Sequence, residues 1–209
     1  MALITVSNNS LTAVTALPAS VPTGALTLIK SITASSSASI SFVDGASGVV
    51  LDDTYKSYIF KFINIHPANS GGRQLQFNLS TDSGSNYNVT KTTTSFYAWH
   101  TESDSVAALA YATGSDLAQS TAYQLLIAGN VGDDADQSLA GSMTLFNPSS
   151  TVFVKHFISR INTHSATPYS MDNYIAGYGN TTSAVNAINF LFDEGNIGSG
   201  QIKLYGLAN

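Results

Sequence analysis

The sequence predicts an all-β protein, a jelly-roll-like β-sandwich with an extended N-terminal arm. Three observations support this prediction. The 209 residues include only two Glu and six Lys, which are common on the exposed faces of helices. Val, Ile, Thr, Tyr and Phe, which favour strands, are abundant. Apolar residues recur two positions apart in short segments that are separated by turn residues, and no long amphipathic helical pattern occurs.

The first 25 residues are expected to form the arm. Their small apolar clusters are separated by a polar Asn-Asn-Ser run and by Pro18 and Pro22, which suits an extended segment better than a packed element. Two interpretations stay open, a frayed chain end and an arm that docks on a neighbouring subunit. In the second interpretation, the contacts are made by Leu3, Ile4, Val6, Leu11, Val14 and Leu17.

Residues 26–209 are expected to form one sandwich domain. Its first strands are predicted at 26–32, 38–42, 58–65, 75–79 and 96–100. Segment 58–65 reads as a central strand, with Tyr58, Phe60 and Phe62 on one face and Ile59, Ile63 and Ile65 on the other. The octet 80–87 looks like a single Asp-box turn, in which the Asp82 carboxylate bonds local backbone N–H groups.

The second half of the chain continues the pattern. Residues 107–111 fit either a strand or a single helical turn, and 123–128 reads as a buried strand. A hairpin is predicted over 138–159, with its turn at 147–150, where Pro148 takes the second turn position. Three last strands are expected at 174–178, 187–192 and 201–205.

Composition narrows the possible partners. The net charge is −5 and the eight Lys and Arg are scattered singly, so no basic stripe exists to bind nucleic acid. Cysteine is absent, which excludes disulfides and thiolate chemistry in this chain. No apolar run is long enough to span a membrane as a helix, and the first residues do not resemble a secretory signal. The protein is therefore expected to be soluble and to be made in a cytoplasm.

Ionisable residues give little basis for catalysis. His66, His100, His156 and His164 show no zinc-binding spacing, although His100 and Glu102 share a strand face and would suit a metal or an acid–base pair. His156 alternates with apolar residues and is expected in or beside the core. The acidic loop at 132–136 is read as solvated, with calcium binding left open. We expect no enzyme activity, no cofactor and no metal.

Aromatic residues suggest an alternative role. A flat ring covers the apolar face of a pyranose, and Tyr97, Trp99, Tyr169 and Tyr178 are candidates for such a sugar-binding platform. Packing in the core or between subunits is the simpler interpretation, because most aromatic residues follow the strand periods.

Four segments carry a resemblance to a known family. They are the Asp-box region 80–88, the turn and strand 147–157, residues 176–184, and the closing run 200–207. Together they resemble virion structural proteins of tailed phages that infect aquatic bacteria, cyanobacteria included. The resemblance covers about residues 26–209 and implies a β-sandwich displayed on a particle, with no catalytic residues to carry over.

This resemblance implies a capsid decoration, or cement, protein. In that role the chain would act as a homotrimer that binds across subunits of the major capsid protein and stabilises the head of the virion. A tail-fibre or receptor-binding module that recognises host surface polysaccharide is the alternative. The scarcity of charge, with 29 Ser and 21 Thr in its place, suits a protein whose work is contact between many copies.

Overall fold

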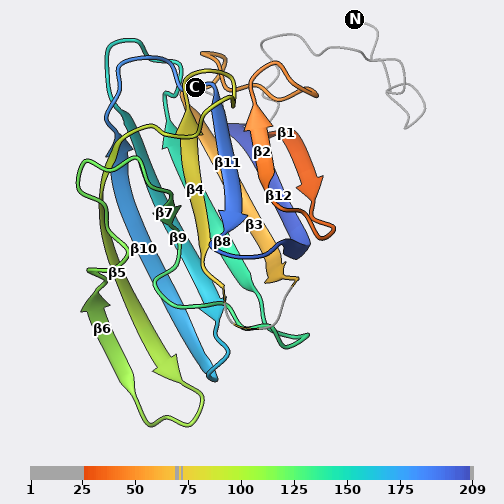
Figure 1. The fold of residues 1–209 in the computed structure, drawn as a ribbon, viewed down its shortest axis with the longest axis vertical. Coiled ribbons are helices and arrows are strands. Elements are labelled where there is room, and N and C mark those ends of the chain that lie inside the picture. Colours follow the sequence, from red (N-terminus) through yellow and green to blue (C-terminus); the bar gives the residue numbers. More distant parts are fainter. Residues whose placement is uncertain (1–25, 69–70, 72, 208–209) are drawn as a thin grey trace, which may run out of the picture.

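The computed structural model describes residues 26–68, 71 and 73–207, which form a sandwich of two antiparallel β-sheets (Figure 1). The predicted β-sandwich is therefore confirmed. The larger sheet has eight strands in the order β1 (Leu26–Thr33), β12 (Ile197–Leu207), β3 (Ser57–Pro67), β8 (Leu139–Phe146), β9 (Lys155–His164), β10 (Tyr169–Gly179), β5 (Lys91–Thr101) and β6 (Ala107–Tyr111). The smaller sheet has the order β2 (Ile40–Val43), β11 (Ala187–Phe192), β4 (Leu75–Ser80) and β7 (Gln124–Leu125).

The strand order interleaves elements from the two ends of the described chain. A jelly roll does the same with eight strands in two sheets. Here the orders β1-β12-β3-β8 and β2-β11-β4-β7 interleave the ends in this manner, while β9, β10, β5 and β6 extend the larger sheet. Because of these four additional strands, the sandwich is wider than a jelly roll of eight strands, and the jelly-roll description stays a prediction.

Aromatic side chains fill the space between the sheets. The Phe190 ring of β11 lies 5.3 Å from the rings of Phe60 and Phe62 on β3, and 6.3 Å from those of Phe42 and Phe77. All five side chains are almost completely buried. Aromatic burial of this extent supplies much of the hydrophobic free energy that holds two sheets together.

A bulge in β3 corrects one part of the predicted alternation. Asn64 has a positive φ of 50°, and the pairing of β3 with β8 shifts register between Phe62 and Ile65. An extra residue in one strand turns the following side chains to the opposite face. Ile65 is therefore fully buried beside Phe62, whereas Ile63 stays 38% exposed. The placement of Ile65 with Ile63 was wrong.

Several strand boundaries differ from those predicted. Strand β5 begins at Lys91, five residues before the predicted start. The inward positions of this first part hold the polar residues Lys91, Thr93 and Ser95, so the sequence shows no apolar alternation there. Strand β9 begins at Lys155, since the Ser150 hydroxyl accepts the N–H groups of two following residues and prolongs the turn. Residues 107–111 form a strand, and the segment predicted at 123–128 contributes only two strand residues.

The Asp-box turn has the predicted construction. The Asp82 carboxylate accepts the Ser80 hydroxyl and both the backbone and side-chain N–H groups of Asn86, and these bonds lower the pKa of Asp82 to about 2. Gly84 adopts a φ of +82°, and the Tyr87 hydroxyl folds back against it. The turn connects β4 to the segment that leads into β5, and so carries the chain from one sheet to the other.

The predicted arm, residues 1–25, lies outside the described residues. The same holds for its expected contact residues Leu3, Ile4, Val6, Leu11, Val14 and Leu17.

Candidate functional site

One side of the eight-stranded sheet is not covered by the smaller sheet, and we call this side the outer face. Strand pairing places on it the side chains that alternate with the buried ones. It carries thirteen large apolar or aromatic residues, several of them exposed, with Leu109 at 72%, Ile158 at 56% and Leu28 at 52%. The thirteen are Leu26, Leu28, Ile59, Ile63, Phe96, Leu109, Tyr111, Phe146, Ile158, Tyr174, Tyr178, Tyr205 and Leu207.

The charges within the strands of the outer face are mainly positive. Lys61 of β3 pairs directly with Lys203 of β12, and Arg160 of β9 lies two strands beyond Lys61. Within these strands the carboxylate is Asp172, which is engaged by Arg160, while Glu102, Asp104 and Asp116 lie at the β5–β6 edge of the face. An excess of cations stands out because the chain as a whole has a net charge of −5. The part of the face around Lys61 and Lys203 is therefore complementary to a partner that is apolar and acidic.

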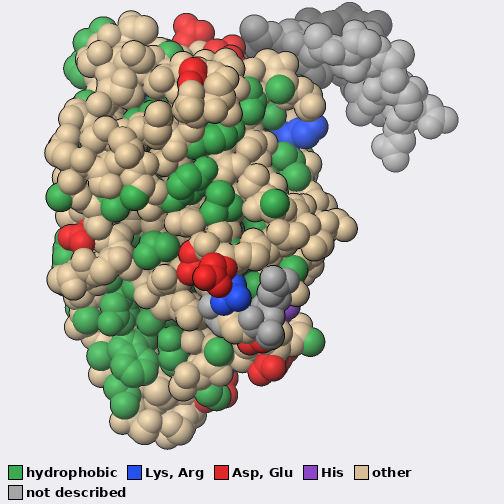
Figure 2. Space-filling model, viewed as in Figure 1, with side chains coloured by type: hydrophobic (Ala, Val, Ile, Leu, Met, Phe, Trp, Pro, Cys, Tyr) green, Lys and Arg blue, Asp and Glu red, His purple; other side chains and the backbone are tan. Residues whose placement is uncertain are grey.

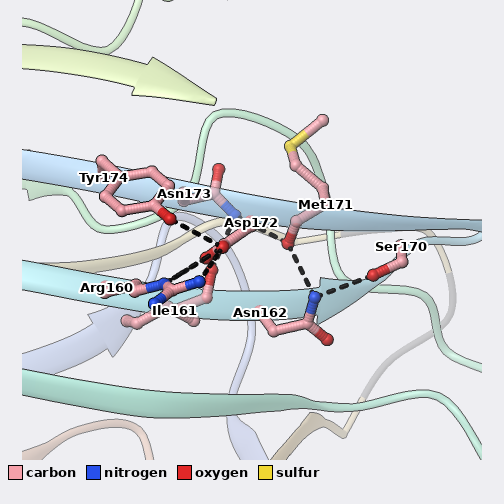
Figure 3. A network of polar contacts seen from close by, with 8 residues as sticks. All are labelled: Arg160, Ile161, Asn162, Ser170, Met171, Asp172, Asn173 and Tyr174. Carbon is pink, nitrogen blue, oxygen red and sulfur yellow. Dashed lines mark hydrogen bonds and ion pairs between the residues drawn. The ribbon is translucent and has the colours of Figure 1, made fainter. Parts of the chain in front are cut away.

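A network of polar contacts stiffens the middle of the outer face (Figure 3). The Arg160 guanidinium donates through Nη2 to Asp172 Oδ2 at 2.7 Å and through Nε at 3.0 Å, while the Tyr174 hydroxyl donates to the same oxygen at 3.0 Å. This bond to Asp172 raises the pKa of Tyr174. The guanidinium lies 5.0 Å from the Tyr174 ring centroid.

The Tyr174 ring also stacks on Phe96. Their centroids are 4.8 Å apart and the ring planes differ by 3°. Stacked rings and a forked ion pair hold these side chains in one arrangement, so little side-chain freedom remains to be lost when a partner binds. The outer face is therefore preorganised for contact at this place.

A shallow groove adjoins this network. It has a volume of about 450 Å³ and is lined by β5, β9 and β10, with the small residues Ala176 and Gly177 between larger side chains. Its lining includes the rings of His156 and Tyr178, which lie 6.0 Å apart, and the side chain of Ile158. The prediction that His156 lies beside the core was wrong, because Lys155 and Phe157 take the inward positions of β9.

A second candidate site lies on the inner side of the same sheet. The ends of β5, β6 and β10 extend beyond the smaller sheet (Figure 1), and hydrophobic side chains gather over this part (Figure 2). A pocket of about 260 Å³ is lined there by Tyr97, Trp99, Tyr169 and Met171, with Ala128 and Gly129 from the segment after β7. The Trp99 and Tyr169 rings meet edge to face at 5.3 Å.

Three of the four residues predicted for a sugar platform are thus brought together. Tyr178 is not among them, because it lies on the outer face, where its partners in the ladder are His156 and Thr92. Tyr97 also lines a neighbouring polar cavity of about 400 Å³, together with Gln74, Thr113 and Ser115. An aromatic floor next to hydrogen-bonding groups is an arrangement that suits carbohydrate.

The histidines and carboxylates form pairs rather than clusters. His100 Nε2 lies 3.0 Å from Asp104 and His164 Nε2 lies 3.6 Å from Glu102, so His100 and Glu102, which would suit a pair, are each matched with another residue. The ring of His66 bonds the carbonyl oxygen of Gln137.

A metal site has no support in the described part of the chain. There, no group of three or more His, Cys, Asp or Glu side chains is placed to hold an ion. In the acidic loop, the Asp133 carboxylate instead accepts the backbone N–H of Gly71 at 3.0 Å.

Two completely buried lysines are the polar feature that sequence reasoning missed. Lys91 and Lys155 flank Gly179 from opposite sides, and burial lowers the pKa of both, that of Lys91 to about 7. The Lys155 ammonium donates to the carbonyl oxygens of Phe153 and Thr181. Each lysine occupies an inward position of its strand, and this position in the strand alternation is the sequence signal that could have indicated its burial.

Among the residues that the structure describes, no helix has the length and apolar character needed to cross a membrane. No protein-family model matches this chain, and no similar protein was found among curated proteins or solved structures.

Proposed function

We propose that this chain is a non-enzymatic structural protein of a phage virion, most specifically a capsid decoration protein. It binds across subunits of the major capsid protein and holds neighbouring subunits together. The observation that carries the proposal is the outer face, a sheet surface that the smaller sheet does not cover, with large exposed apolar side chains and the paired cations Lys61 and Lys203. Soluble monomers seldom expose apolar surface of this kind without using it for contact.

The physical mechanism is binding energy summed over many copies. Opening a shell then requires breaking contacts at every joint that a decoration protein spans, so modest affinity per copy is sufficient. The Phe96–Tyr174 stack and the Arg160–Asp172 fork resemble the rigid aromatic and arginine anchors that dominate binding at protein interfaces. A homotrimer would multiply these contacts further, and residues 1–25 would add contact area if they act as an arm.

Locating the chain on intact particles tests this proposal. Labelling with antibodies, together with quantitative mass spectrometry of purified virions, is expected to place hundreds of copies over the head. A few copies at the tail, or none on the particle, would contradict the decoration role.

A second candidate function is the recognition of host surface polysaccharide by a fibre or receptor-binding module. The observation that favours it is the convergence of Tyr97, Trp99 and Tyr169 beside a polar cavity. Binding to a glycan array through this pocket, combined with a location at the tail, would favour this role over decoration.

A further inference from the structure

Two completely buried polar side chains meet between the sheets. Lys91 belongs to β5 of the larger sheet, and Asn78 belongs to β4 of the smaller one. The Lys91 Nζ donates to Asn78 Oδ1 at 2.5 Å. Neither residue takes part in the outer face or in the aromatic pocket, so the contact requires a separate explanation.

The surroundings of Lys91 fit a neutral amine. Its Nζ has two acceptors, Asn78 Oδ1 and the Val89 carbonyl oxygen at 2.8 Å, which match the two N–H bonds of an amine but leave one of an ammonium group unmatched. Burial lowers the pKa of Lys91 to about 7, so a large share of the molecules carry the neutral form near neutral pH. A neutral amine keeps a lone pair and is a nucleophile.

The carboxamide of Asn78 is held as an electrophile would need to be. Its Nδ2 donates to the carbonyl oxygens of Tyr87 at 2.6 Å and Thr121 at 2.9 Å, which fixes the plane of the amide. The Leu79 backbone N–H donates to Oδ1 at 2.9 Å. Negative charge that develops on Oδ1 during attack on the carbon is therefore stabilised by a fixed donor, as in an oxyanion hole.

The distance is also suitable. A carbonyl bond is about 1.2 Å long. An amine 2.5 Å from Oδ1 can therefore lie no farther than about 3.7 Å from Cγ, which is near the separation of about 3–3.5 Å from which attack on the carbon proceeds. For attack, the N–H donated to Oδ1 must turn away so that the lone pair can point toward Cγ, and rotation about the Cε–Nζ bond allows this exchange.

We propose that Lys91 and Asn78 join in an intramolecular isopeptide bond. The Nζ–Cγ bond forms, the Cγ–Nδ2 bond breaks, and one proton passes from Nζ to Nδ2, which leaves as ammonia. The exchange of one amine for another consumes no oxidant or other reactant. Within the described residues no carboxylate contacts either side chain, so the proton moves between the two nitrogens without a general acid, and the bond accumulates slowly after folding.

Such a bond would connect the two sheets covalently across the Asp-box turn. It closes the chain between residues 78 and 91, and a closed loop resists unfolding by restricting the unfolded chain, as a disulfide does. A chain without cysteine would thereby gain a covalent crosslink by other chemistry. This inference does not depend on the proposed function.

Intact mass spectrometry of the purified full-length protein tests the proposal. Loss of ammonia makes the expected mass about 17 Da lower than that of the sequence. Peptide mapping is then expected to find a branched peptide that joins the segment with Asn78 to the segment with Lys91. An unchanged mass after prolonged incubation near pH 9 would overturn the proposal, and so would a mass deficit without the branched peptide.

Variants provide the matched control. Lys91→Met and Asn78→Ala are expected to have the full mass of their sequences. Lys155→Met removes the other buried lysine, which bonds only backbone carbonyl oxygens, and is expected to keep the deficit. A deficit that persists in Lys91→Met would also overturn the proposal. If the first two variants do not fold, the branched peptide in the unaltered protein remains decisive.

Discussion

Lys61 of β3 and Lys203 of β12 lie directly opposite each other on the outer face, in the middle of two paired strands. Like charges at opposed positions of a sheet are destabilising. The free protein therefore carries a local electrostatic cost on the surface that we propose as its contact surface. An acidic partner would relieve this cost on binding, which gives the pair a role in recognition.

Replacing one lysine of this pair is expected to change the stability of the free protein and its binding to a partner in opposite directions. Lys61→Glu converts a repulsive pair into an attractive one and is expected to stabilise the free protein by about 0.2–1 kcal/mol. The same change is expected to weaken binding to the capsid shell, because it reverses a charge that faces the partner. Chemical denaturation and co-sedimentation with shells measure the two effects. Lys56→Glu, at an exposed loop position before β3, is the control and is expected to alter neither.

The centre of the sandwich is expected to be sensitive to truncation. Phe190→Ala removes the ring that contacts four other phenylalanines and should destabilise the protein by about 3–5 kcal/mol. Val152→Ala, at a side chain that is 68% exposed, should change stability by no more than about 0.5 kcal/mol. Urea denaturation of both variants measures the difference. Equal effects would show that the rings do not form the core.

Stability is expected to depend on pH through the buried Lys155. Burial lowers the pKa of this group in the folded state, so the unfolded state binds more protons between the folded and the unfolded pKa. Above the unfolded pKa, Lys155 is neutral in both states, and the full free energy of unfolding is present. As the pH falls toward the folded pKa, the unfolded lysine binds a proton that the buried one does not, and the free energy of unfolding decreases. The melting temperature should therefore rise with pH below the unfolded pKa of about 10.5 more steeply in the unaltered protein than in Lys155→Met. Parallel curves for the two proteins would refute this.

The aromatic pocket gives a prediction about glycan binding. If the pocket recognises sugar, Trp99→Ala should abolish binding to host polysaccharide, because a stacking ring is lost from the floor. Tyr178→Ala should leave this binding unchanged, since Tyr178 lies on the other side of the sheet. Glycan-array or calorimetric titration compares the two. A larger loss with Tyr178→Ala would move the sugar site to the outer groove.

Apolar alternation predicted the sandwich well where strands bury apolar side chains. The strand with Tyr58, Phe60 and Phe62 was found because its inward residues are aromatic. The start of β5 was missed because its inward positions hold Lys91, Thr93 and Ser95. Their burial depends on partners that the fold supplies from distant segments, such as the Gln124 amide that accepts the Thr93 hydroxyl.

The candidate sites were predicted only in part, for a related reason. The spacing of Tyr97 and Trp99, two positions apart in one strand, places both on one face, and the fold added Tyr169 from the neighbouring strand. It could not reveal that Tyr178 lies on the opposite side, because the pairing of two strands is fixed by long-range packing. The exposure of Ile158 likewise follows from the inward position of Lys155, which reverses the expected face of β9.

Amine footprinting on intact virions tests the central claim, that the outer face is the contact surface on the capsid. A lysine-modifying reagent is applied to the free protein and to particles that carry it, and the modified sites are compared by mass spectrometry. We expect Lys61 and Lys203 to be modified in the free protein and protected on the particle, while the exposed Lys56 reacts in both. Equal modification of Lys61 and Lys203 in the two samples would contradict the account.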